Sequence, residues 1–211
     1  NIGATNVLRT GNKKIAFLTL ILDICKGLIP TIIILKILNQ DLAIVISTGL
    51  VIGHILPILL FKKIKENILI NIYIILISFL SINIILFGRG FISLFGVIII
   101  LINLFYAWGG KAVATGFGVL LALNPLIAIF CILIWLVVIF ATRYSSLSAI
   151  VAFSCAPVIA YILSEQFVEE FYTTDRQLIE FFLFLAIIIW IRHTKNIKNL
   201  LYSKEPKIGK N

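Results

Sequence analysis

The sequence predicts an all-α fold: a polytopic integral membrane protein with about eight membrane-crossing helices in one domain over residues 1–211. Two observations carry this prediction. Hydrophobic residues occupy 61% of the positions and charged residues only 13%, whereas soluble proteins have roughly 45–50% apolar and about 25% charged residues. The apolar residues also gather into long runs, which gives the chain a mean hydropathy of +1.14.

Each long apolar run predicts one crossing, because a helix needs about 20 apolar residues to span the hydrocarbon core. Residues 112–123 form a shorter run that ends at Asn124 and Pro125, and proline suits the first turn of a new helix. This run is either a short crossing or a re-entrant segment, and the sidedness of the loops requires a crossing. The predicted spans are 15–36, 42–61, 67–87, 91–108, 112–123, 126–142, 147–164 and 178–192.

Basic residues mark one side of these spans, as expected for cytoplasmic loops. They precede the first span, follow the second, and recur through the tail after residue 192, whereas the loop at 165–177 is acidic and is expected outside. The segments predicted to face the cytoplasm are 1–14, 62–66, 109–111, 143–146 and 193–211.

The net charge is +9, from 18 Lys and Arg against 9 Asp and Glu. It reflects the cytoplasmic bias of basic loops, an electropositive site for phosphorylated substrates, or both. Nucleic acid is not an expected partner, because no basic stripe lies on a soluble domain. Cys25, Cys131 and Cys155 fall in apolar runs without metal-ligand spacing, so they are expected to be buried structural thiols, and no metal is expected.

The first nine residues are small and polar and end in Arg9. Backbone N–H groups around Thr5 and Asn6 can approach an anion closely, and an arginine offers a bidentate fork to phosphate. The same chemistry recurs at Gly109, Gly110 and Lys111. There, two glycines, a cation and a helix start form either a small phosphate cradle or a flexible turn.

Several polar residues lie within or beside the apolar runs. Asp23 and Lys26 are three residues apart and share a helix face, so they form either a structural ion pair or a pair that also orders a pocket. His54, in the second span, is a packing or hydrogen-bonding residue, a catalytic base, or a polar contact near a site. Arg143 and Ser146, between two spans, are an interfacial anchor and a helix cap.

The tail carries His193 and Asn196, which are three residues apart. If the last helix continues, they lie on one face together with Ile197 and Leu200. That arrangement predicts an amphipathic strip that folds back on the membrane face, and Glu205 follows it. Taken alone, His193 could equally be a solvated residue.

These pieces occur in one order: NIGATNVLR, DxxKG, GHxxP, GGKxVAT, RYxSLS, and RHxxNIxxL followed by a glutamate. The ordered set resembles the acyl-phosphate-dependent glycerol-3-phosphate acyltransferases of bacteria, the PlsY family. The resemblance covers residues 1 to about 62 and 109 to 209. It implies an enzyme that transfers a fatty acyl group from acyl-phosphate to the 1-hydroxyl of sn-glycerol-3-phosphate, which yields 1-acylglycerol-3-phosphate and phosphate for phospholipid synthesis.

The resemblance further implies a multi-pass protein of the bacterial inner membrane, with membrane lipid around it, its active site facing the cytoplasm, no cofactor, and a monomeric form. The implied catalytic residues are Arg9, His193 and Asn196. The implied phosphate-binding residues are Thr5, Asn6, Gly109, Gly110 and Lys111. The structural polar residues are Asp23, Lys26, His54, Arg143, Ser146 and Glu205.

Acyl-phosphate is an activated anhydride, so positioning and charge stabilisation can supply most of the catalysis. No Ser-His-Asp arrangement is evident, and a covalent enzyme intermediate is not required. The hydroxyl proton passes to a substrate phosphate or to His193, and the sequence leaves both routes open.

The chain departs from the family pattern in three places. The family's first span, with a glycine and a serine expected to contact substrate, would precede Asn1, so the chain is expected to be N-terminally truncated. Residues 63–108 separate Lys62 from the glycine pair and are expected to be an inserted transmembrane hairpin. Trp108 and Ala112 replace a usual lysine and a common glycine, which should weaken anion binding.

These departures keep two other hypotheses open. One is a catalytically inactive, truncated remnant of the same family. The other is a small transporter, although transporters often contain internal repeats and none is evident here.

Overall fold

The computed structural model describes residues 3–55, 110–166 and 176–209, and all regular secondary structure within these ranges is helical. The predicted hairpin at 63–108, Gly109 and most of the acidic loop lie outside the described residues, as does the side chain of Arg9. The helices are α1 (Ala4–Arg9), α2 (Lys13–Ile37), α3 (Gln40–Ile55), α6 (Val113–Leu123), α7 (Pro125–Thr142), α8 (Ser145–Gln166), α9 (Arg176–Arg192) and α10 (Thr194–Leu201).

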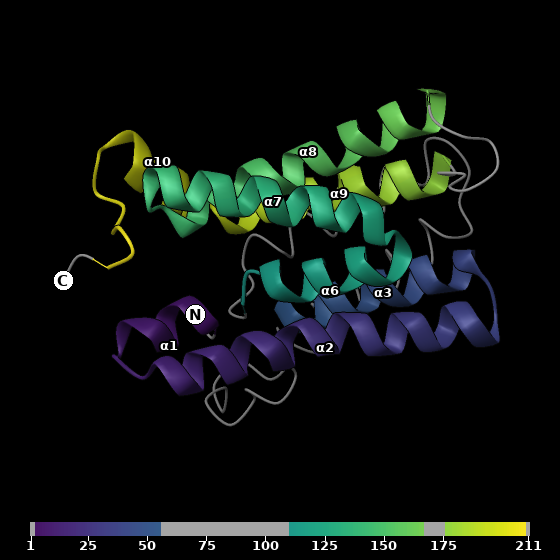
Figure 1. Cartoon of the computed structure of the whole chain (residues 1–211), viewed down its shortest axis with the longest axis horizontal. Coiled ribbons are helices and arrows are strands. Elements are labelled where there is room, and N and C mark those ends of the chain that lie inside the picture. The colour runs from purple at the N-terminus through teal and green to yellow at the C-terminus, as the bar shows by residue number, and fades with distance from the viewer. Residues whose placement is uncertain (1–2, 56–109, 167–175, 210–211) are drawn as a thin grey trace, which may run out of the picture.

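The long helices form two layers (Figure 1). In one layer α8 packs against both α7 and α9, and in the other α2 packs against both α3 and α6. The short helices α1 and α10 lie at the same end of the molecule, close to the start of α2 and the end of α9. This end is therefore where the N-terminal and C-terminal motifs can meet.

The described residues contain three helices long and apolar enough to cross a membrane: Lys13–Ile37, Pro125–Thr142 and Ser145–Ser164. A fourth crossing results if α9 and α10, which are bent by 61° at their junction, count as one broken span. The helices α3 and α6 are apolar but shorter. The predicted total of about eight is thus not reached within these residues, and two predicted spans, 67–87 and 91–108, lie outside them.

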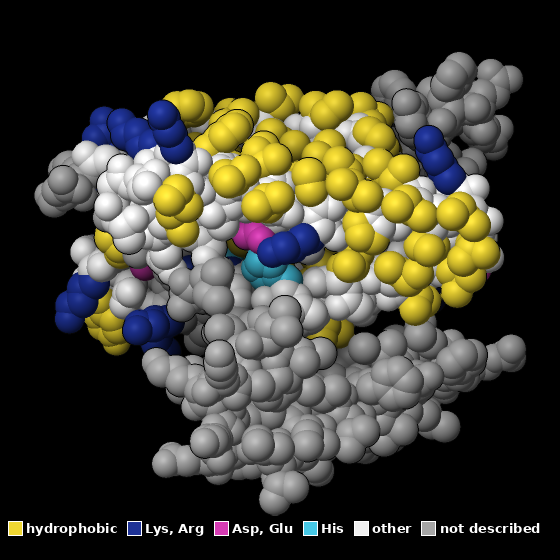
Figure 2. Space-filling model, turned by 90° about the horizontal axis from the view of Figure 1, so that it is seen from below, with side chains coloured by type: hydrophobic (Ala, Val, Ile, Leu, Met, Phe, Trp, Pro, Cys, Tyr) yellow, Lys and Arg dark blue, Asp and Glu magenta, His cyan; other side chains and the backbone are white. Residues whose placement is uncertain are grey.

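Large apolar side chains cover the outer surface of the spans, as a lipid environment requires. Phe17 on α2 is 66% exposed, and Phe140 on α7 is 80% exposed. Figure 2 shows hydrophobic side chains over much of the described part of one face, with a single group of charged and histidine side chains near its centre. The interior of the bundle is also apolar, and Phe117, Phe153 and Phe182 lie in its main cluster.

The break between α6 and α7 forms as the sequence predicts. Pro125 occupies the first turn of α7, and the Asn124 side chain accepts a hydrogen bond of 3.1 Å from the Ile127 N–H. An amide or carboxylate side chain at this position satisfies one of the unpaired amides of a helix start. The run at 112–123 is consequently an eleven-residue helix that ends sharply at Leu123.

Candidate active site

A cavity of about 560 Å³ opens between α1, α2, α6, α7, α8, α10 and the segment that follows α10. Nine of the residues singled out from the sequence contribute to its wall. They are Thr5, Asn6, Asp23, His54, Lys111, Ser146, His193, Asn196 and Glu205. The fold thus gathers polar residues from distant parts of the sequence around one space.

A chain of hydrogen bonds links three of the motifs. Lys111 Nζ donates to Asn196 Oδ1 at 2.7 Å, and Asn196 Nδ2 donates to Glu205 Oε1 at 2.7 Å. The same carboxylate oxygen accepts a bond of 2.7 Å from Ser146 Oγ. Glu205 is buried, and its other oxygen, Oε2, has no hydrogen-bond partner among the described residues. Glu205 therefore fixes Asn196, and Asn196 fixes the Lys111 ammonium.

The bend after α9 brings these residues together. The His193 N–H bonds to the carbonyls of Ile189 and Trp190, and α10 then leaves at 61° to α9. After α10, Ser203 adopts a positive φ of 56°, and the amides of Lys204 and Glu205 both donate to the Asn199 carbonyl. The predicted amphipathic strip is therefore a separate helix, and a tight turn returns Glu205 beneath Asn196.

His193 is held in one tautomer. Its Nδ1 lies 2.7 Å from the carbonyl oxygen of Ile189, and a carbonyl can only accept, so Nδ1 carries the proton. Burial, with a further contribution from the Lys111 charge, lowers the pKa of His193 to about 4. The imidazole is thus neutral near pH 7, and its Nε2 is a hydrogen-bond acceptor. Nε2 of His193 is therefore suited to accept a hydrogen bond from a substrate hydroxyl group.

A second polar cluster lies deeper, between α2, α3 and α6. Asp23 forms the predicted ion pair with Lys26, with 2.8 Å between Oδ1 and Nζ, and the same oxygen lies 4.0 Å from His54 Nδ1. His54 Nδ1 is also 3.1 Å from Thr115 Oγ1. Asp23 is buried while Lys26 is exposed. The pair therefore anchors a buried carboxylate in the cavity wall.

The loop before α6 differs from a simple glycine cradle. The Gly110 N–H donates to the His54 carbonyl at 3.3 Å, so this predicted phosphate-binding amide already has an internal partner. Ala112 takes a left-handed conformation, φ 58°, at the start of α6. The first amides of a helix have no intrahelical acceptor, and Val113 and Ala114 line the cavity. The start of α6 is thus a better candidate for anion binding than Gly110.

The remainder of the cavity wall is apolar. Phe117 and Trp135 meet edge to face, with 6.5 Å between ring centroids. The Trp135 Nε1 is buried without a hydrogen-bond partner among the described residues. The other apolar lining residues include Leu20, Ile24, Leu121 and Ile132. One cavity therefore combines charged and polar residues with an apolar wall that suits a hydrocarbon chain.

Arg143 contributes through its backbone. It ends α7 with a positive φ of 62°, and its carbonyl accepts a 2.8 Å bond from the Ile208 N–H. The Lys207 ammonium lies 5.3 Å from the centre of the Tyr144 ring. These contacts hold the last described residues across the α7–α8 junction, and Pro206 and Ile208 consequently line the cavity.

Sequence reasoning missed several residues of the wall, among them Ile24, Trp135, Lys195 and Asn199. Asn199 had a usable signal, since it stands three residues after Asn196 and so shares its helix face. No sequence signal indicated that Trp135 lines the cavity, because this residue lies within an uninterrupted apolar run.

Fold and cavity together define a helical membrane protein with a charge-lined site at one end. A family model for glycerol-3-phosphate acyltransferase matches residues 1–203. The chain is 33% identical over 215 aligned residues to a glycerol-3-phosphate acyltransferase of Neisseria gonorrhoeae (strain NCCP11945), covering 99% of this chain and 80% of that protein. It is 34% identical to the enzyme of the same name from Wolbachia pipientis subsp. Culex pipiens (strain wPip), covering 98% of this chain and 80% of the relative.

Solved structures agree with these relatives. The crystal structure of PlsY (YgiH), an integral membrane glycerol 3-phosphate acyltransferase, in its glycerol 3-phosphate form superposes with a TM-score of 0.69 at 26% identity, covering 99% of this chain and 78% of that one. Its lysophosphatidic acid form gives a TM-score of 0.67. The chain belongs to this family of bacterial, integral membrane glycerol-3-phosphate acyltransferases.

Proposed function

We propose that this chain transfers a fatty acyl group from acyl-phosphate to the 1-hydroxyl of sn-glycerol-3-phosphate, giving 1-acylglycerol-3-phosphate (lysophosphatidate) and phosphate. The observation that carries the proposal is the Lys111–Asn196–Glu205 chain of hydrogen bonds at the polar end of a cavity whose other end is apolar. Such a cavity matches a donor that has a phosphate at one end and a hydrocarbon chain at the other.

Lys111 is the cation that holds a substrate phosphate in this proposal. Its ammonium already donates to Asn196, which restricts its position, and an ammonium has three donors in all. Positioning of this kind lowers the entropy lost when two phosphorylated substrates meet. Thr5 and Asn6 of α1 line the same cavity and supply further contacts, and Val113 and Ala114 at the start of α6 line it as well. Arg9 keeps the catalytic role that the family resemblance implies.

The reaction needs little chemistry from the protein. The glycerol hydroxyl oxygen attacks the carbonyl carbon of acyl-phosphate, and the bond between that carbon and the phosphate oxygen breaks. His193 Nε2 accepts a hydrogen bond from the hydroxyl and orients it. The departing phosphate takes the proton and leaves as inorganic phosphate, because its oxygen becomes strongly basic as the bond to carbon breaks, whereas burial lowers the pKa of His193 to about 4.

The acyl chain of the donor occupies the arm lined by Phe117, Leu121, Ile132 and Trp135. We also propose the finer topology: about eight crossings, a location in the bacterial inner membrane, and a cavity that faces the cytoplasm. The reaction uses no metal or cofactor, and a monomer suffices. Residues 63–108 form an inserted hairpin within a single acyltransferase domain.

The direct test is an assay of purified full chain for phosphate release from palmitoyl-phosphate in the presence of glycerol-3-phosphate. Release that depends on both substrates, with lysophosphatidate as the second product, supports the enzyme. No release above background from protein that melts cooperatively would instead identify an inactive remnant. Substrate flux into liposomes without acyl transfer would identify a transporter.

A further inference from the structure

A second cavity, of about 350 Å³, lies at the junction of α9 and α10, and the acyl-transfer reaction does not use it. Its wall consists of Ile191, Arg192, Thr194, Lys195 and Lys198. Three of these five residues are cations and none is acidic. Among the described residues, neither Lys195 nor Lys198 forms an ion pair with a carboxylate. The cavity is therefore an electropositive space.

The cavity begins where the lipid-facing surface of α9 ends. Leu183, Ile187 and Trp190 are 51%, 38% and 50% exposed and form an apolar stripe along α9. Ile191 continues that stripe, because it follows Ile187 by four residues. Trp190 donates from Nε1 to Ser154 Oγ at 2.8 Å, and tryptophan concentrates at the boundary between hydrocarbon and headgroups. The three cations thus follow directly on the end of the apolar stripe, where a bilayer along that stripe would present its headgroups.

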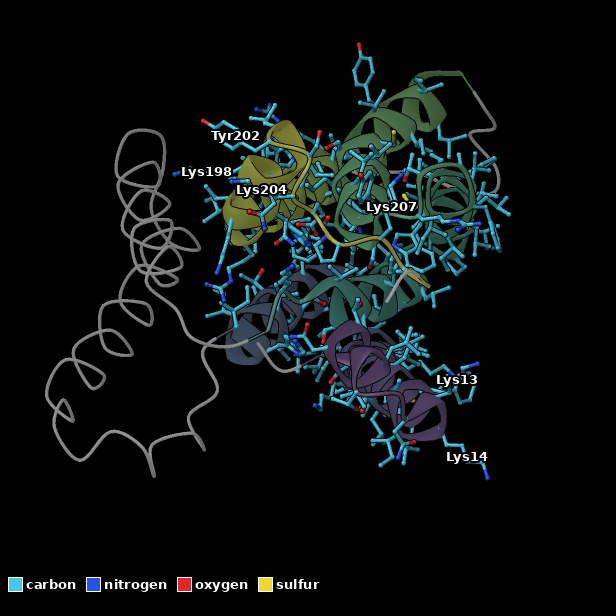
Figure 3. The ribbon with its side chains drawn as sticks, turned by 90° about the vertical axis from the view of Figure 1, so that its left-hand side faces the viewer. Lys13, Lys14, Lys198, Tyr202, Lys204 and Lys207 are labelled. Atoms are coloured by element: carbon cyan, nitrogen blue, oxygen red, sulfur yellow. The ribbon has the colours of Figure 1, made fainter. Side chains whose placement is uncertain are left out.

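The 61° bend between α9 and α10 produces this geometry. Thr194 uses its hydroxyl to bond the Ile191 carbonyl at 2.7 Å, which fixes the corner and leaves the cationic side chains to line the space. Figure 3 shows Lys198 extending from α10 on the same side as Tyr202 and Lys204, well away from Lys13 and Lys14 on α2. Leu201 and Tyr202, one turn further along, expose 77% and 73% of their surface.

We propose that this cavity binds the phosphate headgroup of an anionic bilayer phospholipid, whose acyl chains lie along the Leu183–Trp190 stripe. A headgroup phosphate complements the positive charge of the wall, and the stripe accommodates hydrocarbon over about 12 Å from Leu183 to Ile191, at 1.5 Å per residue. Basic pockets between helices at the cytoplasmic surface bind anionic headgroups in this way. The site does not depend on acyl transfer, although Lys195 lines both cavities.

The test is native mass spectrometry of the full chain released from micelles that contain equal amounts of phosphatidylglycerol and phosphatidylcholine. Wild-type protein retains phosphatidylglycerol preferentially. Lys198→Gln lowers that preference about fivefold, since each cation near an anionic lipid contributes about 1 kcal/mol. Lys198→Arg retains the preference because it keeps the charge. Lys204→Gln is the matched control, since Lys204 lies on the same side but lines neither cavity.

Three results would overturn the proposal. Equal retention of the two lipids by wild-type protein would show that the cavity does not select anionic headgroups. An equal loss in the Lys198→Gln and Lys204→Gln variants would reduce the effect to general surface charge. Complete displacement of the lipid by an equal concentration of inorganic phosphate would show that the cavity recognises free phosphate and that the apolar stripe contributes nothing.

Discussion

Gly27 and Gly118 face each other where α2 crosses α6, and each lies against the backbone of the other helix. A Cβ on Gly27 would collide with the carbonyl oxygen of Thr115, and one on Gly118 would collide with that of Ile24. Small residues at such crossings allow helix backbones to approach closely within a membrane. Because Ile24 lines the cavity and Thr115 contacts His54, the crossing sets the distance between Asp23 and the start of α6.

Replacing Gly27 with alanine is expected to lower the thermal stability of the purified protein, because neither backbone can move aside. Overpacking of this kind costs about 1–3 kcal/mol. Gly49→Ala is the control, since Gly49 is helical and a Cβ added there would meet nothing within 4 Å. Equal melting temperatures for the two variants would contradict the close approach of the α2 and α6 backbones at Gly27.

Removing the Lys111 ammonium is expected mainly to raise the KM for glycerol-3-phosphate. Lys111→Ala deletes one charge-assisted contact worth about 1.5–3 kcal/mol, which corresponds to roughly a tenfold to hundredfold rise. Steady-state kinetics with varied glycerol-3-phosphate measure the effect. Lys14→Ala, which removes an exposed cation outside the cavity wall, should leave KM unchanged. An unchanged KM in Lys111→Ala would refute the phosphate-holding role.

Substitution of Glu205 distinguishes its acceptor role from its charge. Glu205→Ala removes the partner of both Ser146 and Asn196, and leaving the buried Ser146 hydroxyl without an acceptor costs about 1–3 kcal/mol. Glu205→Gln keeps one acceptor oxygen and should retain more stability and more activity. Thermal melting and initial rates of the two variants measure the difference. Identical behaviour of the alanine and glutamine variants would rule out the acceptor role.

Acid should destabilise the protein partly through His193. Its pKa falls from 6.5 to about 4 on folding, so the unfolded chain binds more protons than the native state between these values. The free energy of unfolding therefore declines as the pH falls through this window. Above pH 6.5 the imidazole is neutral in both states, and none of this free energy is lost. Melting curves of wild type and His193→Gln across that range should converge or cross toward acid. Parallel curves would mean that His193 titrates normally.

The insert hypothesis gives a deletion experiment. If residues 63–108 are a late addition, a chain that joins Lys62 directly to Gly109 should fold and retain or gain acyl transfer. Size-exclusion chromatography and the phosphate-release assay measure the two properties. Complete loss of folding would show that the segment is integral to the domain.

The sequence predicted those features of the fold that depend on local patterns. The apolar runs located α2, α7, α8 and α9 to within a few residues, and Pro125 located the break before α7. The pairing of Asp23 with Lys26 also followed from helical spacing alone. Each of these predictions needs only residues that are neighbours along one helix.

Contacts between helices were harder to predict. Nothing in the sequence indicates that the Gly110 amide bonds to the His54 carbonyl or that Thr115 lies beside the His54 ring. The predicted strip depended on a continuous last helix, whereas the chain bends by 61° at His193 and continues as a separate helix, α10. Packing between α2, α3 and α6 decides these details, and one sequence does not reveal it.

The hydrogen bond from the Ile208 amide to the Arg143 carbonyl has a consequence for biosynthesis. The cavity wall includes both Thr5 of α1 and Ile208, which follows α10. During translation, Glu205 can secure Asn196 only after α10 and the turn that follows it have been synthesised. A nascent chain that stops before Glu205 would therefore hold inserted helices around an unfinished polar wall.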